Sequence, residues 1–177
     1  MSISHPHIFW LFGLSGAGKS TLAEHLIKHL RCTGHPVLAL DGDDLRAGLC
    51  KGLGFSDEDR SENLRRAAEA AHLGLRSGLY VVASFITPLE SHRRLVAGIL
   101  NPNISFIHIS APLEICRARD VKGLYAGAKS GKVSQMTGVS SGFEDPSHAD
   151  LTLTTAQQSI ENCGDQLAGF AHRLPPR

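Results

Sequence analysis

Residues 13–20 read Gly13-Leu14-Ser15-Gly16-Ala17-Gly18-Lys19-Ser20, which matches every fixed position of the pattern G-x-x-x-x-G-K-[ST]. An apolar run at residues 8–12 precedes this stretch, and residues 21–30 follow it with apolar side chains at helical spacing. A strand, a glycine-rich turn and a helix in this order direct backbone N–H groups and a helix N-terminus at one anion. The stretch therefore predicts a loop that binds the phosphates of a nucleoside triphosphate. A glycine-rich turn without a ligand is the alternative.

The same motif assigns roles to individual residues. Lys19 is expected to reach the outer phosphates, and the hydroxyl of Ser20 is expected to bind Mg²⁺. No N-K-x-D guanine-reading motif occurs in the chain, so a GTPase is not expected. The predicted phosphate-contacting residues are Gly13, Leu14, Ser15, Gly16, Ala17, Gly18, Lys19, Ser20 and Thr21.

Strand-like and helix-like segments alternate along the chain. Five short runs rich in Val, Ile, Leu or Phe lack polar alternation, as strands buried on both faces do. This alternation predicts an α/β fold of the P-loop NTPase type. We expect a parallel five-stranded sheet with helices on both faces and ligands at the carboxyl ends of the strands. All of residues 1–177 is expected to form one domain. The expected strands are 8–12, 37–40, 79–84, 104–109 and 151–153, and the expected helices are 19–31, 43–50, 57–77, 89–99, 112–119 and 156–172.

Residues 120–150 do not fit this alternation. They are rich in glycine, serine and lysine and show no sustained hydrophobic period. A loop of this length inside a compact domain is typically functional or disordered. We expect a mobile lid that closes over the phosphates and excludes water; a disordered insertion is the alternative.

Acidic residues follow the second expected strand. Asp41 and Asp43 alternate on extended chain, so one carboxylate can face the Mg²⁺ shell while the other faces an acceptor hydroxyl. The third expected strand ends Ser84-Phe85 without the aspartate that many P-loop ATPases place there. The alternative role for Asp43 is a helix N-cap.

Basic and aromatic residues come next in the chain. Arg60 and Asn63 lie three positions apart on the long expected helix and so share a face, with Arg46 just upstream. Three such donors indicate an anionic substrate. Phe55, which precedes the expected cap Ser56, is either a stacking platform for a base or a hydrophobic staple.

Composition sets limits on the partners. The chain has a net charge of +1 and 20% charged residues, which does not favour a nucleic-acid or membrane-surface partner. No apolar run approaches the roughly 18 residues of a membrane span. The four cysteines are scattered and form no C-x-x-C pair, which is typical of reduced thiols in a cytoplasmic protein.

Seven stretches, in this order and spacing, resemble the adenylyl-sulfate kinase family over about residues 8 to 150. That family uses ATP to phosphorylate the 3′-hydroxyl of adenosine 5′-phosphosulfate, which produces the activated sulfate donor of sulfate assimilation. The matching stretches are 13–21 (GLSGAGKST), 40–49 (LDGDDLRAGL), 53–66 (LGFSDEDRSENLRR), 84–88 (SFITP), 112–120 (PLEICRARD), 122–125 (KGLY) and 143–146 (FEDP).

The resemblance implies a role for each matching residue. Asp43 corresponds to the aspartate at the acceptor 3′-hydroxyl, and Asp41 to the one near Mg²⁺. Phe55 and Phe143 correspond to two aromatics that sandwich the acceptor adenine, and Arg119 to an arginine against the ATP adenine. It also implies a small-molecule substrate and allows a homodimer. The implied catalytic residues are Lys19, Asp43 and Thr87, and the implied acceptor-binding residues are Asp43, Arg46, Phe55, Arg60, Asn63, Ile86, Thr87, Lys122 and Phe143.

Several positions depart from the family pattern. Thr87 replaces a serine, Lys129 replaces a lid arginine, and Met136 replaces a phenylalanine. Because the lid carries less positive charge over the phosphates than the family pattern does, a kinase acting on another 5′-nucleotide conjugate is one alternative. A non-catalytic nucleotide-binding module is a second alternative.

Overall fold

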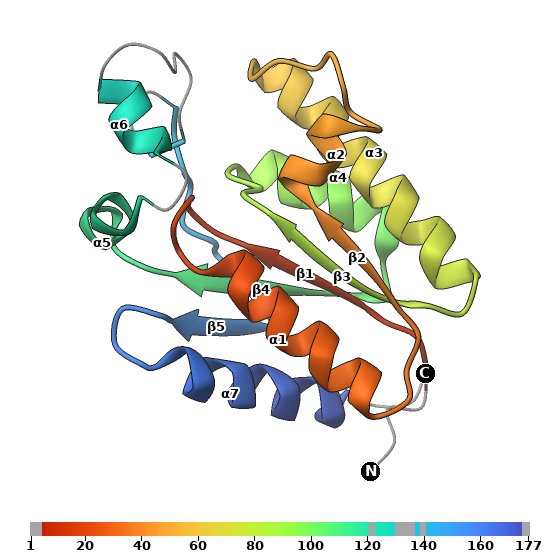
Figure 1. The fold of residues 1–177 in the computed structure, drawn as a ribbon. Coiled ribbons are helices and arrows are strands. Elements are labelled where there is room, and N and C mark those ends of the chain that lie inside the picture. Colours follow the sequence, from red (N-terminus) through yellow and green to blue (C-terminus); the bar gives the residue numbers. More distant parts are fainter. Residues whose placement is uncertain (1–4, 121–122, 130–136, 139–140, 175–177) are drawn as a thin grey trace.

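A single parallel sheet forms the centre of the fold. The computed structural model describes residues 5–120, 123–129, 137–138 and 141–174. Its strands run in the order β2-β3-β1-β4-β5, and all paired neighbours are parallel (Figure 1). The predicted α/β class and the parallel five-stranded sheet are therefore confirmed. The strands are β1 (Ile8–Phe12), β2 (Val37–Asp41), β3 (Tyr80–Phe85), β4 (Ile104–Ser110) and β5 (Leu151–Thr154).

Helices cover both faces of this sheet, as predicted. α1 (Lys19–Cys32) and α7 (Ile160–Arg173) pack together on one face, while α3 (Asp57–Arg76) and α4 (Glu90–Leu100) pack on the other (Figure 1). Three helices are shorter. α2 (Gly42–Ala47) follows β2, α5 (Leu113–Arg119) follows β4, and α6 (Leu124–Lys129) comes after α5.

β1 lies in the middle of the sheet because every one of its side chains is apolar and buried. Phe9 and Leu11 belong to the core on the α1 and α7 face, whereas Ile8, Trp10 and Phe12 belong to the core on the α3 and α4 face. Side chains alternate between the two faces of a strand, so one apolar run contributes to both cores. The phosphate-loop sequence follows directly at the carboxyl end of this central strand.

Two helices begin or end three or more residues from the positions that the sequence indicates, whereas the other predicted helices agree within one residue. The last helix starts at residue 160 rather than 156, because the Ser159 hydroxyl accepts a hydrogen bond from the Asn162 amide and caps it there. α2 covers residues 42–47 rather than 43–50. The side chain of Asp41 caps its start, and Gly48 follows its end.

The 120–150 segment contains regular structure, so the expectation of a loop without any is wrong at residues 124–129. The carboxylate of Asp120 accepts hydrogen bonds from the amides of Tyr125 (3.0 Å) and Ala126 (2.9 Å), which fixes the start of α6. The Tyr125 hydroxyl donates to the carbonyl of Ser15 at 3.0 Å, so α6 contacts the phosphate loop. Residues 121–122, 130–136 and 139–140 lie outside the described residues, and the mobility of this segment stays a prediction.

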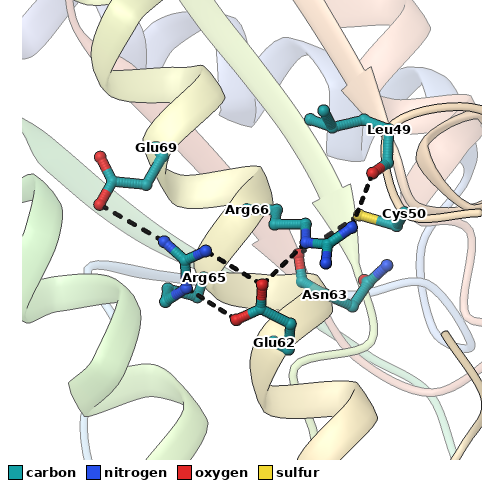
Figure 2. Close-up of polar contacts among 7 residues, drawn as sticks. All are labelled: Leu49, Cys50, Glu62, Asn63, Arg65, Arg66 and Glu69. Atoms are coloured by element: carbon teal, nitrogen blue, oxygen red, sulfur yellow. Dashed lines mark hydrogen bonds and ion pairs between the residues drawn. The ribbon is translucent and has the colours of Figure 1, made fainter.

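A polar cluster on α3 fastens the loop that follows α2 (Figure 2). Glu62 accepts hydrogen bonds from both Arg65 and Arg66, and Arg66 also donates to the carbonyl of Leu49 at 3.0 Å. Next to this cluster, the Cys50 thiol donates to the carbonyl of Asn63. The hydrogen bonds from the two arginines lower the pKa of Glu62 from 4.5 to about 2.

Glu62→Gln is expected to lower the melting temperature at pH 7 by a small amount, because the ion pairs of Glu62 with Arg65 and Arg66 are exposed to water and screened by salt. A carboxylate whose folded-state pKa is depressed adds stability above its unfolded pKa and loses it as pH falls through the folded pKa. The difference between wild type and variant should therefore shrink between pH 4.5 and about 2. Thermal melts of wild type and variant between pH 7 and pH 2, with Glu69→Gln as the control, measure this difference. A difference in melting temperature that does not change with pH would contradict the prediction.

Candidate active site

A cavity of about 570 Å³ opens at the carboxyl ends of the strands, between the phosphate loop and the helices α2 and α3. This is where ligands bind in open parallel sheets. The predicted phosphate-binding residues and the predicted acceptor-binding residues both contribute to its wall. The predicted residues that line it are Ser15, Gly16, Gly18, Lys19, Ser20, Thr21, Asp41, Asp43, Arg46, Phe55, Arg60, Asn63, Ile86, Thr87 and Arg119.

The backbone of the phosphate loop leaves no room for side chains at two glycines. A Cβ at Gly13 (φ +147°) would collide with the backbone oxygen of Ile109, and one at Gly16 (φ +79°) would lie 2.8 Å from the oxygen of Cys116. α1 begins at Lys19 without a side-chain cap. The start of this helix lies at the cavity, where helix N-termini attract anions, which agrees with the predicted phosphate site.

Lys19 lies folded over this loop. It is 9% exposed, and its Nζ donates to the carbonyl of Leu14 at 2.8 Å. The ammonium is thereby held at the cavity wall, close to the N-terminus of α1. A positive charge there can stabilise negative charge on bound phosphates.

Arg119 stabilises the phosphate loop by hydrogen bonds to its backbone. Its guanidinium donates to the carbonyl of Gly16 (3.3 Å) and to the carbonyl of Thr155 (2.7 Å). The hydroxyl of Thr155 in turn donates to the carbonyl of Ala17 at 2.7 Å. Sequence reasoning missed Thr155, although its place directly after β5 could have indicated it, since ligands gather at strand ends.

Oxygen donors suitable for Mg²⁺ meet beside the loop. The Ser20 hydroxyl donates to Asp41 Oδ2 at 3.0 Å, and the Ser84 hydroxyl lies 3.5 Å from that of Ser20. Among the described residues, no cluster of three or more His, Cys, Asp or Glu side chains could hold a metal by itself. A serine hydroxyl and one carboxylate beside a phosphate site fit Mg²⁺, which keeps waters and uses phosphate oxygens as ligands.

Asp41, and not Asp43, caps α2. Asp41 Oδ1 accepts a hydrogen bond from the Asp43 amide at 2.9 Å. Asp43 lies in the first turn of the helix and lines the cavity. The alternative interpretation of Asp43 as the helix cap is therefore wrong, and Asp43 lies at the cavity wall.

Two guanidinium groups flank Phe55 on the acceptor side. The guanidinium carbon of Arg46 lies 4.3 Å from the ring centroid, and that of Arg60 lies 5.7 Å from it. The ring is 52% exposed, and the helix position that would complete a hydrophobic staple is Arg60 rather than an apolar residue. The staple interpretation therefore fails, and the ring forms part of the open cavity wall.

Backbone carbonyls hold these two arginines in place. Arg46 donates to the carbonyl of Gly54 at 2.9 Å, and Arg60 donates to the carbonyl of Phe55 at 2.9 Å and to the Thr137 hydroxyl at 3.0 Å. Burial is the main cause that lowers the pKa of both guanidiniums. Because they are partly desolvated, their attraction to an anion is stronger than it would be in water.

Asn63 presents an amide without a protein partner. The residue is 4% exposed and lines the cavity, yet its Nδ2 has no hydrogen-bond partner among the described residues. Buried donors are normally satisfied, and leaving one unpaired costs about 1–3 kcal/mol. A polar ligand in the cavity would satisfy it.

Thr87 adopts a strained conformation at the cavity wall. Its φ is +43°, which is unfavourable for a β-branched residue, and the side chain is 1% exposed. The indole nitrogen of Trp10 donates to its hydroxyl oxygen at 2.9 Å. Strained residues held in this way often occur at functional sites.

Among the predicted acceptor-binding residues that the structure describes, Phe143 alone is not part of the cavity wall. Its ring instead stacks on that of His108, with the two ring centroids 6.1 Å apart. Lys122 lies outside the described residues. The contact that the sequence implies between Phe55 and Phe143 across a base is therefore absent from the described structure.

Comparisons with known proteins point to one family. The model of the family described as adenylylsulphate kinase matches residues 5–154. The adenylyl-sulfate kinase of Marinobacter nauticus is 44% identical over 167 residues, which are 93% of this chain and 83% of that protein. The adenylyl-sulfate kinase of Shewanella denitrificans is 48% identical over 158 residues, or 88% of this chain and 77% of that protein.

The fold comparison agrees. The structure of an APS kinase of Mycobacterium tuberculosis in complex with AMPPNP and APS superposes with a TM-score of 0.90 and 36% identity. The match covers 95% of this chain and 98% of that one. Sequence, topology and the residues around the cavity thus lead to the same conclusion: the chain belongs to the adenylylsulphate kinase family.

Proposed function

We infer that this chain transfers the γ-phosphoryl group of ATP to the 3′-hydroxyl of adenosine 5′-phosphosulfate. The products are 3′-phosphoadenosine 5′-phosphosulfate and ADP, and the reaction activates sulfate for assimilation. The observation that carries this inference is that one cavity contains both the phosphate loop and the expected acceptor-binding residues. The acceptor-side wall of this cavity consists of an aromatic ring, two guanidiniums and an amide nitrogen that has no hydrogen-bond partner among the described residues.

On the donor side, the N–H groups at the start of α1 and the ammonium of Lys19 would bind the phosphates of ATP. Phosphoryl transfer needs little covalent chemistry from the protein, so catalysis depends on positioning and on stabilising charge between the two oxygens. Lys19 lies where it can follow the charge that develops on the transferred group. Its donation to Leu14 would then be exchanged for donation to a phosphate oxygen.

We propose that Ser20 and Asp41 hold Mg²⁺ together with the phosphates. Held there, Mg²⁺ would supply positive charge beside the phosphates. Ser20 would contribute its hydroxyl oxygen, and Asp41 would accept hydrogen bonds from the ion's waters or bind it directly. Ser84 supplies a neighbouring hydroxyl in place of an acidic residue at the end of β3.

Asp41→Asn should raise the Mg²⁺ concentration required for half-maximal turnover. An asparagine caps a helix as well as an aspartate does, so the melting temperature should hardly change. Loss of a group that orients metal ligands typically costs about 10–100-fold in metal affinity. Titration of turnover with MgCl₂, after chelation with EDTA, measures the shift; an unchanged Mg²⁺ requirement would remove Asp41 from the metal site.

On the acceptor side, we propose that Arg46, Arg60 and Asn63 bind the phosphosulfate group and that Phe55 stacks on the adenine. Asp43 would then receive the 3′-hydroxyl, opposite the phosphate loop. The hydroxyl of Thr87 accepts from Trp10 and would donate its own proton to the acceptor. A second stacking role for Phe143 would require residues 141–146 to shift from the packing against His108. Lys122 and Arg119 keep their predicted roles at the lid and at the ATP base as proposals.

Phe55→Ala should weaken binding of the acceptor much more than binding of ATP. Stacking of a base on an aromatic side chain is worth about 1–3 kcal/mol, which corresponds to roughly 5- to 150-fold in Kd. Calorimetric titration with each nucleotide measures both affinities. Leu73→Ala, an exposed apolar residue on the same long helix as Arg60, is the control. Unchanged acceptor affinity in Phe55→Ala would make the ring a surface residue without a ligand.

An acceptor panel tests the function itself. We expect ADP release to depend on adenosine 5′-phosphosulfate and to remain near the acceptor-free rate with AMP or other 5′-nucleotide conjugates. Faster turnover on another conjugate would favour the alternative kinase. Nucleotide binding without acceptor-dependent ADP release on any compound would favour a non-catalytic module.

Two further expectations concern the state of the protein. Among the described residues, no helix has both the length and the apolar character that crossing a membrane demands. A cytoplasmic location and a homodimer stay predictions. Sedimentation of the purified chain distinguishes a dimer from other assemblies.

A further inference from the structure

One buried arginine that takes no part in the cavity wall connects two segments beside it. Arg93 on α4 is 5% exposed, and its guanidinium lies 5.4 Å from the centroid of the Phe12 ring. One terminal nitrogen donates to the carbonyls of Thr87 (3.2 Å) and Pro88 (3.3 Å). The other donates to the carbonyl of Glu144 at 3.1 Å, and Nε donates to Glu90 Oε2 at 3.0 Å.

The first of these segments is the strained turn at the acceptor wall. Thr87 holds a φ of +43° and faces the cavity together with Ile86 and Pro88. A β-branched residue persists in this conformation only where its surroundings fix it. Trp10 holds the Thr87 side chain, and Arg93 holds the main-chain carbonyls of the same turn.

The second segment begins at Phe143. The amide of Glu144 donates to the carbonyl of Pro88 at 2.9 Å, and its carboxylate accepts from the amide of Glu90 at 2.6 Å. The guanidinium of Arg93 bonds the Glu144 carbonyl from the same side. The strained turn and residues 143–144 therefore form one unit around a single buried cation.

We propose that Arg93 is a positioning residue for acceptor binding. By bonding three carbonyls, it sets the Thr87 turn and the segment after Phe143 in a fixed relation to the acceptor half of the cavity. It does so without touching the phosphate loop. This role rests on the proposed function, because it concerns where the acceptor of that reaction sits.

Removal of the guanidinium would take one donor from each of the carbonyls of Thr87, Pro88 and Glu144, of which Pro88 would keep the Glu144 amide, and would release the strain at Thr87. A small displacement of groups that position a substrate can cost on the order of 10²-fold in rate. The donor half contacts this turn through the Gly13 amide, which donates to the carbonyl of Ile86 at 3.2 Å. The rest of the phosphate loop depends on other contacts, namely those of its carbonyls with Lys19 and Arg119. The predicted signature is therefore a loss that falls mainly on the acceptor.

The chain carries its own reporter for this turn. Trp10 is the sole tryptophan, it is fully buried, and its indole nitrogen bonds Thr87. Its emission should change when the turn moves. A variant that merely lost stability, with the turn intact in the folded state, would keep the wild-type emission.

The experiment compares Arg93→Met, Arg93→Lys and Arg94→Met in full-length protein. Arg94 is the matched control, since it lies next along α4, also pairs with Glu90 (3.5 Å) and is 80% exposed. Steady-state kinetics yield KM for adenosine 5′-phosphosulfate and for ATP, and Trp10 emission is recorded without ligand. Arg93→Lys retains a buried cation and serves if the methionine variant does not fold.

We expect KM for the acceptor to rise at least about tenfold in Arg93→Met and by less in Arg93→Lys. KM for ATP should stay within about twofold, and the Trp10 emission should shift in both Arg93 variants. Arg94→Met should match wild type. A folded Arg93 variant with wild-type acceptor KM and wild-type emission would overturn the proposal, as would equal losses for both substrates. Failure of wild type itself to turn over adenosine 5′-phosphosulfate would refute the proposed function instead, and the Trp10 emission would still decide whether Arg93 holds the turn.

Discussion

Replacement of Lys19 by alanine is expected to lower the rate of phosphoryl transfer by on the order of 10²–10³. Lys19 sits at the cavity wall with its ammonium 2.8 Å from the Leu14 carbonyl, next to the start of α1. Its charge would act mainly on negative charge that develops during transfer, so turnover should fall more than ATP affinity. Steady-state kinetics at saturating ATP and acceptor measure the loss.

Lys28→Ala is the control for this prediction. Lys28 lies on the exposed face of the same helix, so its removal changes the net charge equally but leaves the cavity intact. Thermal melts should show that both variants remain folded. A folded Lys19→Ala protein with near wild-type turnover would contradict the assignment of the phosphate loop as the catalytic centre.

Asp43→Asn should reduce turnover by about 10²–10⁴, which is the range for a positioned group in proton transfer. Asp43 lies in the first turn of α2 at the cavity wall, and its role would be to orient the 3′-hydroxyl and accept its proton. Because this interaction matters most in the transition state, acceptor affinity should change only modestly. Turnover at saturating Mg²⁺ and the acceptor Kd together measure the split.

A change at Asp43 tests the catalytic role separately from helix capping. Asp41 caps α2, so a change at Asp43 does not remove the helix cap. Asp44→Asn, in the same first turn but outside the cavity wall, controls for charge at the helix N-terminus. If Asp43→Asn turns over at the wild-type rate, the catalytic role passes to Asp41.

Much of the fold follows from local patterns. The fully apolar run at residues 8–12 is predicted to be a strand buried on both faces, and the structure places it at the centre of the sheet. Ser56, three acidic residues after it and Gly78 fixed the limits of the long helix, which forms over Asp57–Arg76. Such signals act within one turn of helix or one strand, so they can be interpreted without knowledge of the tertiary structure.

The site was predictable where its residues follow strands. The phosphate loop comes directly after β1, Asp41 ends β2 and Asp43 lies two residues further on, and parallel topology brings these strand ends together. Arg60 and Asn63 share a helix face, and both line the cavity. The capping role of Asp41 was missed because β2 continues one residue further than its apolar run indicates, to Asp41 itself.

The remainder depends on contacts between distant residues. The hydrogen bond between Trp10 and Thr87 spans 77 positions, and the bond from Arg93 to Glu144 spans 51. No local period or motif encodes these pairings. The position of Phe143 against His108 and the short helix α6, whose start depends on the Asp120 carboxylate, also follow from the folded surroundings.

The central claim is that the cavity brings the γ-phosphate of ATP to the 3′-hydroxyl of adenosine 5′-phosphosulfate. The most direct measurement is the identity and yield of product, by mass spectrometry and ³¹P NMR, with the natural acceptor and with its 3′-deoxy analogue. We predict one 3′-phosphorylated product per ADP with the natural acceptor. With the analogue, we predict ADP release no faster than without acceptor. Phosphorylation of the 3′-deoxy compound, or of the natural acceptor at another position, would contradict the account.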